Sequence, residues 1–310
     1  MNTQSNAVPD SPLDERVVAP AAMVATRPFY WSVRRELWEN RYLYIAPVGV
    51  GGLILFARLI SLAHLPSRMR TILTLDPMAQ RMAIEQHYMM TAGLLMLTAM
   101  LVGAFYCIEA LHGERRDRSI LFWKSLPVSD LMTVLSKMAI PVVVLQLIAF
   151  VVTLAVQWIM LLLSSAVLLG SGISAAMLWT RLPIVQMSAM LLYHLLILHG
   201  LWHAPFYGWF LMVSSWAKRA PFLWAVVPPL AIGIAEKIAF NTSYFASMLW
   251  THVGGSPDGG SRAQSGSMSD MLGHFEPVKL LTAPGFWAGL AVTAIFLAAA
   301  ARLRRYREPI

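Results

Sequence analysis

The stretch Glu109–Lys137, EALHGERRDRSILFWKSLPVSDLMTVLSK, is the longest charged segment between two strongly apolar runs of the chain. Five charged residues (Glu114–Arg118) are followed by four apolar residues (Ile120–Trp123) and then by Pro127. This order favours a short amphipathic helix at a membrane surface, with its basic side in water and its aromatic side chains at the lipid boundary. Pro127 is expected to end that helix, because its ring lacks an N–H and disfavours helical geometry in the preceding residue.

A new helix is expected after this proline. Ser129 or Asp130 can cap its N-terminus, and the helix then runs through Lys137 into the apolar run Ile140–Leu169. The charged segment would therefore connect two membrane crossings.

The composition is that of a membrane protein. Of the 310 residues, 57% are hydrophobic and only 13% are charged, whereas ordinary soluble domains carry about 25% charged residues. Several apolar runs approach the roughly 20 residues that a helix needs to cross a bilayer. We therefore expect an all-α integral membrane protein with six transmembrane helices. The net charge of +8 does not indicate nucleic-acid binding, because the basic residues lie at the ends of apolar runs.

The expected organisation begins with a disordered cytoplasmic tail and an amphipathic interfacial helix, and a transmembrane domain follows. The tail covers 1–26, the interfacial helix 27–42 and the transmembrane domain 43–301. The spans are expected at about 43–62, 88–111, 138–169, 183–213, 221–240 and 284–301. The cytoplasmic coupling segment covers 112–137, the long extracytoplasmic loop 241–283 and the basic cytoplasmic tail 302–310.

The distribution of Lys and Arg predicts the orientation. Sixteen of these residues lie on the side that holds both termini and the 110–137 segment, and six lie in the three opposite loops. The positive-inside rule then places both termini and that segment in the cytoplasm.

The amphipathic helix shows a four-residue repeat. Phe29, Val33 and Leu37 recur on one face, with Arg35 and Glu39 on the other side. This pattern predicts a helix on the cytoplasmic membrane surface that leads into the first span and contacts membrane lipids.

Nucleotide-binding and hydrolase motifs are missing from the sequence. It contains no GxxxxGK[ST], dinucleotide fingerprint, GxSxG or HExxH. We therefore expect no cofactor on this chain, and any ATP that drives it must bind another chain. The single cysteine, Cys107, lies in an apolar run and is expected to be a packing residue.

Three polar residues inside spans allow a different reading. His199 and His203 share a helix face at a spacing that suits metal binding or a proton relay, although hydrogen-bonded packing or pore lining is the commoner role of polar residues inside a span. Glu236 fits either a coupling-ion site or a charged end that reaches water. These residues leave open an ion-coupled carrier or a membrane enzyme.

Prolines inside spans are candidate hinges. Pro205, Pro228 and Pro229 each remove a backbone donor and allow a kink. Kinks also occur in passive bundles, so a hinge and a static bend both remain open.

The charged segment resembles a known family. Glu114, Arg118, Ser119, Leu121, the string Leu126-Pro127-Val128-Ser129 and Lys137 are similar to the segment between the second and third spans of type-two ATP-binding-cassette membrane subunits. The helix Arg34-Arg35-Glu36-Leu37-Trp38-Glu39-Asn40 resembles the entry helix of that family, and the six-span layout extends the similarity over roughly 28–305. The long outer loop departs from the family, since only Met268–Leu281 could supply part of a re-entrant helix.

The resemblance implies a permease subunit of an exporter in a bacterial inner membrane, which is not itself an enzyme. Two such subunits, identical or paralogous, would pair, and each would rest on a cytoplasmic ATPase that binds ATP and Mg. The Glu114–Ser125 helix would lie in a groove of the ATPase, with Arg115, Arg116 and Arg118 facing acidic side chains. The other docking residues implied are Leu121, Trp123 and Pro127, with Arg34, Arg35, Glu36 and Trp38 in the entry helix. A solvated basic loop and a non-transporting membrane anchor for an ATPase are the alternatives.

Overall fold

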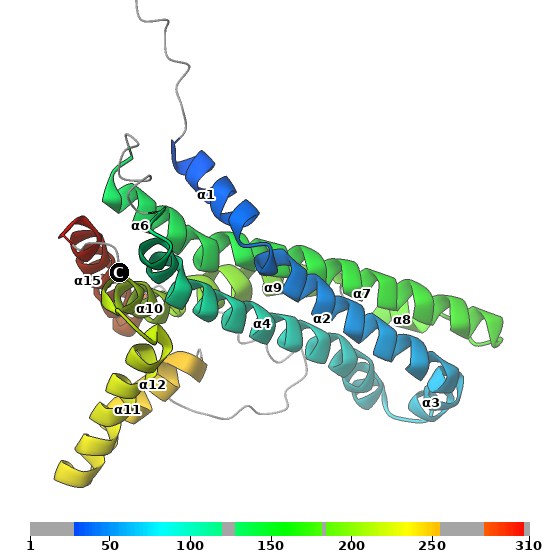
Figure 1. The fold of residues 1–310 in the computed structure, drawn as a ribbon. Coiled ribbons are helices and arrows are strands. Elements are labelled where there is room, and N and C mark those ends of the chain that lie inside the picture. The colour runs from blue at the N-terminus through cyan, green and yellow to red at the C-terminus, as the bar shows by residue number, and fades with distance from the viewer. Residues whose placement is uncertain (1–27, 120–127, 182–183, 255–281, 307–310) are drawn as a thin grey trace, which may run out of the picture.

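The computed structural model describes residues 28–119, 128–181, 184–254 and 282–306, and every regular element in these ranges is a helix (Figure 1). Within the described ranges, six helical stretches are long and apolar enough to cross a membrane, which makes this a multi-pass membrane protein, as the sequence predicts. These stretches are Tyr42–Leu73, Pro77–Arg116, Asp130–Gly170, Ile184–Trp202, Pro221–Phe240 and Pro284–Tyr306.

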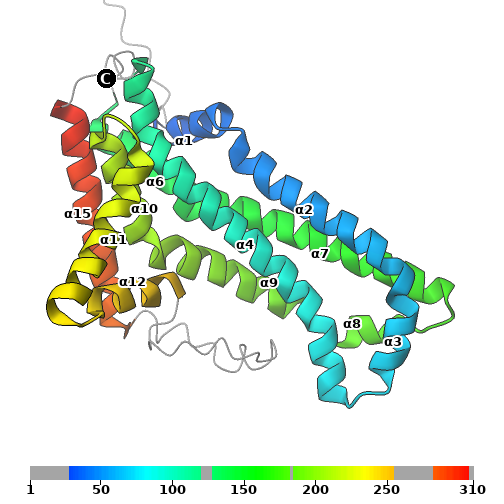
Figure 2. The same ribbon diagram turned by 60° about the horizontal axis from the view of Figure 1, so that its bottom comes forward.

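The first part of the chain forms three long helices that lie side by side (Figures 1 and 2). They are preceded by the short helix α1. The bounds are α1 Pro28–Glu39, α2 Tyr42–Ser61, the 3₁₀ turn η1 Leu62–His64, α3 Leu65–Leu73, α4 Pro77–Arg116, α6 Asp130–Ala139, the π-helical η2 Ile140–Val144, α7 Leu145–Gly170 and α8 Ala176–Arg181. Both α4 and the α6–α7 stretch extend beyond the spans expected from hydropathy, because polar turns at their ends stay helical.

Side-chain caps explain where two of these helices start. The Asp76 carboxylate accepts hydrogen bonds from the N–H groups of Met78 and Ala79 and so begins α4. Ser129 Oγ accepts from Met132 N at 3.2 Å and begins α6. Of the two caps that the sequence allowed, Ser129 is the one used.

The predicted fourth span, 183–213, is not one straight helix. It comprises α9 Ile184–Tyr193, the π-helical η3 His194–Trp202 and α10 Ala204–Trp216. Figure 2 shows α10 running in a different direction from α9, beside α15. The change of direction occurs at His203, two residues before Pro205, which occupies the first turn of α10 and supplies no N–H to the preceding helix.

The last part of the chain contains α11 Pro221–Phe240, α12 Tyr244–Gly254 and α15 Pro284–Tyr306. The main core lies between α4, α6, α10 and α15, where Tyr106, Leu111, Val134, Tyr207 and Leu211 are almost completely buried. Cys107 belongs to this core, which confirms it as a packing residue. The helix α1, the end of α4, the start of α6 and the end of α15 meet at one end of the bundle (Figure 2).

Candidate functional site

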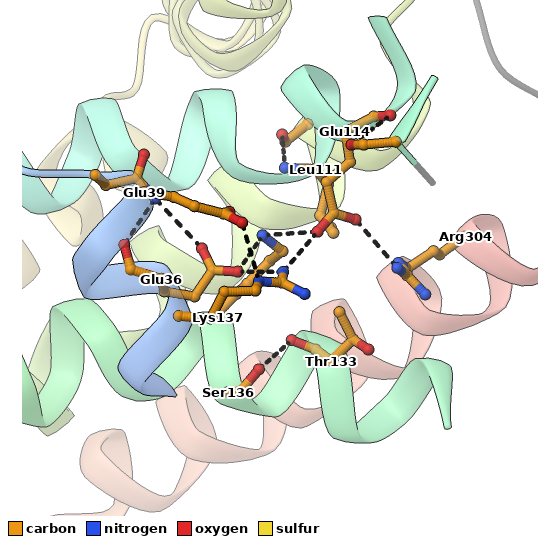
Figure 3. A network of polar contacts seen from close by, with 12 residues as sticks. Glu36, Glu39, Leu111, Glu114, Thr133, Ser136, Lys137 and Arg304 are labelled. Carbon is orange, nitrogen blue, oxygen red and sulfur yellow. Dashed lines mark hydrogen bonds and ion pairs between the residues drawn. The ribbon is translucent and has the colours of Figure 1, made fainter. Parts of the chain in front are cut away.

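A cluster of charged side chains lies where α1, α4, α6 and α15 meet (Figure 3). We call it the charged cluster, and its members are Arg35, Glu36, Glu114, Asp130, Lys137 and Arg304. It contains three cationic and three anionic side chains. Its charges therefore balance, which is the condition under which several charges can be buried together.

Lys137 lies at the centre of the cluster, with only 2% of its side chain exposed. Its Nζ contacts Glu36 Oε1 at 2.8 Å and Glu114 Oε1 at 3.1 Å (Figure 3). The second carboxylate oxygen of Glu36 accepts a hydrogen bond from the Tyr106 hydroxyl at 2.7 Å. This one lysine therefore joins α6 to α1 and to the end of α4.

Arg304, near the end of α15, binds one acid near the end of α4 and another at the start of α6. Its Nη2 contacts Glu114 Oε2 at 3.1 Å, and its Nη1 donates to Asp130 Oδ1. Glu114 lies two residues before the end of α4, and Asp130 is the first residue of α6. One side chain of the last helix thus binds the residues on both sides of 115–129.

Arg35 completes the cluster from the side of α1. Its Nη2 lies 2.9 Å from Glu36 Oε1 and 3.3 Å from Glu114 Oε1, and its Nε lies 3.4 Å from Glu39 Oε1. Burial raises the pKa of the Glu39 carboxyl, and the Arg35 guanidinium partly opposes that rise. Glu39 therefore takes up a proton at a higher pH than an ordinary glutamate, and its pair with Arg35 weakens as it does so.

The charged segment differs from the single helix expected over Glu114–Ser125. The helix α4 continues to Arg116, and Arg118 has a left-handed backbone with φ of 56°, which ends α4. Arg115 points inward: it is 2% exposed, and its Nη1 donates to the backbone oxygens of Ser215 and Ala217 at 2.9 and 3.2 Å. The guanidinium of Arg115 thus binds backbone oxygens inside the bundle and does not face outward, contrary to the expectation that it faces a partner.

Arg116 and Arg118 are exposed, and Arg116 pairs with Glu109 and Asp117 at the surface. The remaining residues assigned to docking from the sequence lie outside the described residues. These are Leu121, Trp123 and Pro127.

Val33 and Leu37 of α1 pack against the core as predicted, whereas Phe29, which was expected on the same face, is exposed. The outer face of α1 carries Trp31, Arg34 and Trp38, all exposed, with the Arg34 guanidinium 5.2 Å and 5.5 Å from the centres of the two tryptophan rings. Such aromatic and basic side chains are typical of a helix at a membrane interface.

Glu236 is a helix cap. Its carboxylate accepts hydrogen bonds from Thr242 Oγ1 and from the N–H groups of Tyr244 and Phe245, at 2.6 to 2.8 Å. These bonds fix the turn between α11 and α12 and give the carboxylate a structural role.

The histidines form a pair rather than a larger polar site. The rings of His199 and His203 are 5.3 Å apart, and His203 Nδ1 lies 2.6 Å from Leu198 O. Among the described residues, no three His, Cys, Asp or Glu side chains are grouped so that they could hold a metal ion. Neither His199 nor Glu236 therefore belongs to a set of groups with evident chemistry.

The candidate hinge prolines differ in their settings. Pro205 lies at the change of direction between η3 and α10, whereas Pro228 and Pro229 lie within α11, which stays helical through both. That any of them moves is still a prediction.

The sequence did not reveal the pairing in the cluster. Tyr106 and Arg304 carried no signal beyond an apolar run and a basic tail, and Lys137 was noticed only for its position after the charged segment. The chain matches no protein-family model, and no curated protein or solved structure shows significant similarity to it.

Proposed function

We propose that this chain is the permease subunit of an ATP-binding-cassette exporter in a bacterial inner membrane. In this proposal two permease subunits, identical or paralogous, form the substrate pathway. Each rests on a separate cytoplasmic ATPase, which binds the ATP and Mg that drive transport. The proposal combines six apolar helices, the missing nucleotide-binding motifs, and the resemblance of Glu114–Lys137 to the matching segment of that family.

The observation that carries the proposal is that residues 115–129, within the charged segment, are attached on both sides. Arg304 binds Glu114 on one side of these residues and Asp130 on the other. A segment that only fixed membrane topology would need basic residues and no such attachment. A segment that receives force needs a stiff connection to the helices that must move.

The contacts suggest the path of that force. Movement of residues 117–129 would act on α15 through Arg304 and on α1 through the contact of Lys137 with Glu36. ATP must then bind one arrangement of the permease and its ATPase more tightly than the other, because a ligand with equal affinity for both shifts nothing. Hydrolysis would return the pair to its starting arrangement.

Co-purification tests the docking surface. A tagged chain should retain a protein that hydrolyses Mg-ATP, and the double variant Arg116→Glu, Trp123→Ala should lose it while its melting transition is unchanged. The matched control is Arg70→Glu, which makes the same charge change on an exposed side chain of α3, away from the charged segment. If the double variant keeps both the ATPase and ATP-driven transport, the docking surface is wrong.

Cysteine labelling tests the orientation. Cys107, the only cysteine, is fully buried, so a new cysteine is the one that an impermeant maleimide reaches. Asp117→Cys should be labelled only in inside-out vesicles, and Ser67→Cys, on α3 at the other end of α2, only in right-side-out vesicles. Labelling of Asp117→Cys from outside the cell would place the segment where no cytoplasmic ATPase can reach it, and the proposal would fail.

A further inference from the structure

An apolar cavity of about 200 Å³ lies between α4, α7 and the α9–η3 stretch, apart from the charged cluster. Four methionines line it: Met89 and Met96 from α4, and Met187 and Met190 from α9. Gly93 also lines it, and a Cβ at that position would meet no atom within 4 Å. Methionine side chains adapt their shape to a ligand, and their sulfur atoms make favourable contacts with aromatic rings.

Two of the polar side chains that line the cavity, Gln157 and His194, have remaining hydrogen-bonding atoms that are acceptors. A third, Tyr88, has a buried hydroxyl without a partner in the described residues, and this hydroxyl can accept as well as donate. Gln157 donates from Nε2 to the backbone oxygen of Tyr88 at 3.3 Å, which leaves the side-chain carbonyl Oε1. His194 Nδ1 lies 3.2 Å from Met190 O, and because a carbonyl only accepts, Nδ1 carries the proton. In the neutral ring Nε2 is then an acceptor. A ligand that supplied one donor would satisfy such a group, whereas a lipid acyl chain has no donor to supply.

We propose that this cavity binds an uncharged, single-ring aromatic molecule that carries one hydrogen-bond donor, such as a phenol. The size fits, because an apolar cavity of about 150 Å³ accommodates a benzene ring. The lining supplies methionine contacts to the ring and an acceptor to the hydroxyl, and it holds no charge that an ionic ligand could pair with. The inference does not rest on the proposed transport function, since it concerns binding within one copy of the chain.

The test uses the full-length protein in lipid nanodiscs with 4-fluorophenol as the probe, and empty nanodiscs as the blank for partition into lipid. Binding is followed by broadening of the fluorine NMR signal. We expect broadening with the wild-type protein and its loss in Gly93→Leu, which fills the cavity. Gly52→Leu is the matched control: Gly52 lies on α2, a Cβ there also meets open space, and it does not line the cavity. This variant should bind the probe as the wild type does.

Two isomers test the hydrogen bond. The isomers 4-methylphenol and anisole contain the same atoms, but only 4-methylphenol has a hydrogen-bond donor. It should therefore displace the probe at a roughly three- to tenfold lower concentration than anisole, the range expected for one hydrogen bond. In Gln157→Met this difference should shrink if Gln157 is the acceptor.

No broadening in the wild type beyond that of empty nanodiscs would overturn the proposal, as would binding that persists in Gly93→Leu. Equal displacement by the two isomers would refute the requirement for a donor. Binding in detergent that disappears in nanodiscs would mean that an acyl chain occupies the cavity, and this result also contradicts the proposal.

Discussion

Replacing Lys137 with methionine tests whether the charged cluster holds the helix ends together. Methionine has a similar length and keeps the packing, but it removes the ammonium group that lies between Glu36 and Glu114. Breaking a buried ion pair from one side costs roughly 3–5 kcal/mol, because the remaining charge is left without compensation. Here each carboxylate keeps an arginine partner, so we expect a cost near the lower limit, about 3 kcal/mol.

The measurement is the free energy of unfolding in mixed micelles with a denaturing detergent, followed by circular dichroism. Lys237→Met is the matched control, because Lys237 is exposed near the end of α11 and makes a single long contact, 3.5 Å to Asn241 O. That variant should stay within about 0.5 kcal/mol of the wild type. A cost below about 1 kcal/mol for Lys137→Met would refute the reasoning.

A double-mutant cycle separates the ion pair from other effects of the substitution. If Lys137 and Glu36 stabilise each other, combining Lys137→Met with Glu36→Gln should cost at least about 1 kcal/mol less than the two single changes together, because the second change removes the charge that the first left unpaired. Strictly additive costs would mean that the 2.8 Å contact contributes nothing.

Two further substitutions test the packing of the bundle. Arg115→Met should cost about 2 kcal/mol in the same unfolding assay, because it removes the charged donor from the backbone oxygens of Ser215 and Ala217; an unchanged stability would show that Arg115 faces water. Gly200→Ala should cost about 3 kcal/mol, because its Cβ would collide with the backbone oxygen of Val142 where η3 crosses η2. An alanine that folds with wild-type stability would contradict that close approach.

The membrane character and the helical regions could be predicted because hydrophobicity is a local property of the chain. Each apolar run is long enough by itself to indicate a span, and six such runs became six apolar helices. The same holds for the start of α6, because the cap formed by Ser129 involves a residue only three positions away. The four-residue repeat also predicted that Val33 and Leu37 lie on one face of α1, and this face packs against the core.

The charged cluster could not be predicted because its contacts join residues far apart in the sequence. Lys137 and Glu36 are 101 positions apart, and Arg304 and Glu114 are 190 apart. A charge near the end of a span indicates only the membrane topology. The neighbouring residues in the sequence do not distinguish an arginine that faces water from one that binds two acids. Pairing of this kind is decided by how the helices pack.

Arg115 shows where a local signal did exist. Within a run of five charged residues, charge alone does not show which side chains face the bundle and which face water. The three arginines therefore looked equivalent. If α4 continues from the span, however, Cys107, Leu111 and Arg115 follow one another at four-residue steps on one face. The first two are buried core residues, and so is the third. The error was to begin a new helix at Glu114 instead of continuing the existing one.

The balance of the cluster constrains how the proposed movement could occur. A buried ion cluster contributes little net stability compared with apolar packing, but separating its charges is costly. Any arrangement that pulled α15 away from α6 would break the contact between Arg304 and Asp130, and one that moved α1 away would leave Glu36 without Lys137. The four helix ends that meet there should therefore move as one body. Bending then falls to places without charges, such as the change of direction at His203 between η3 and α10.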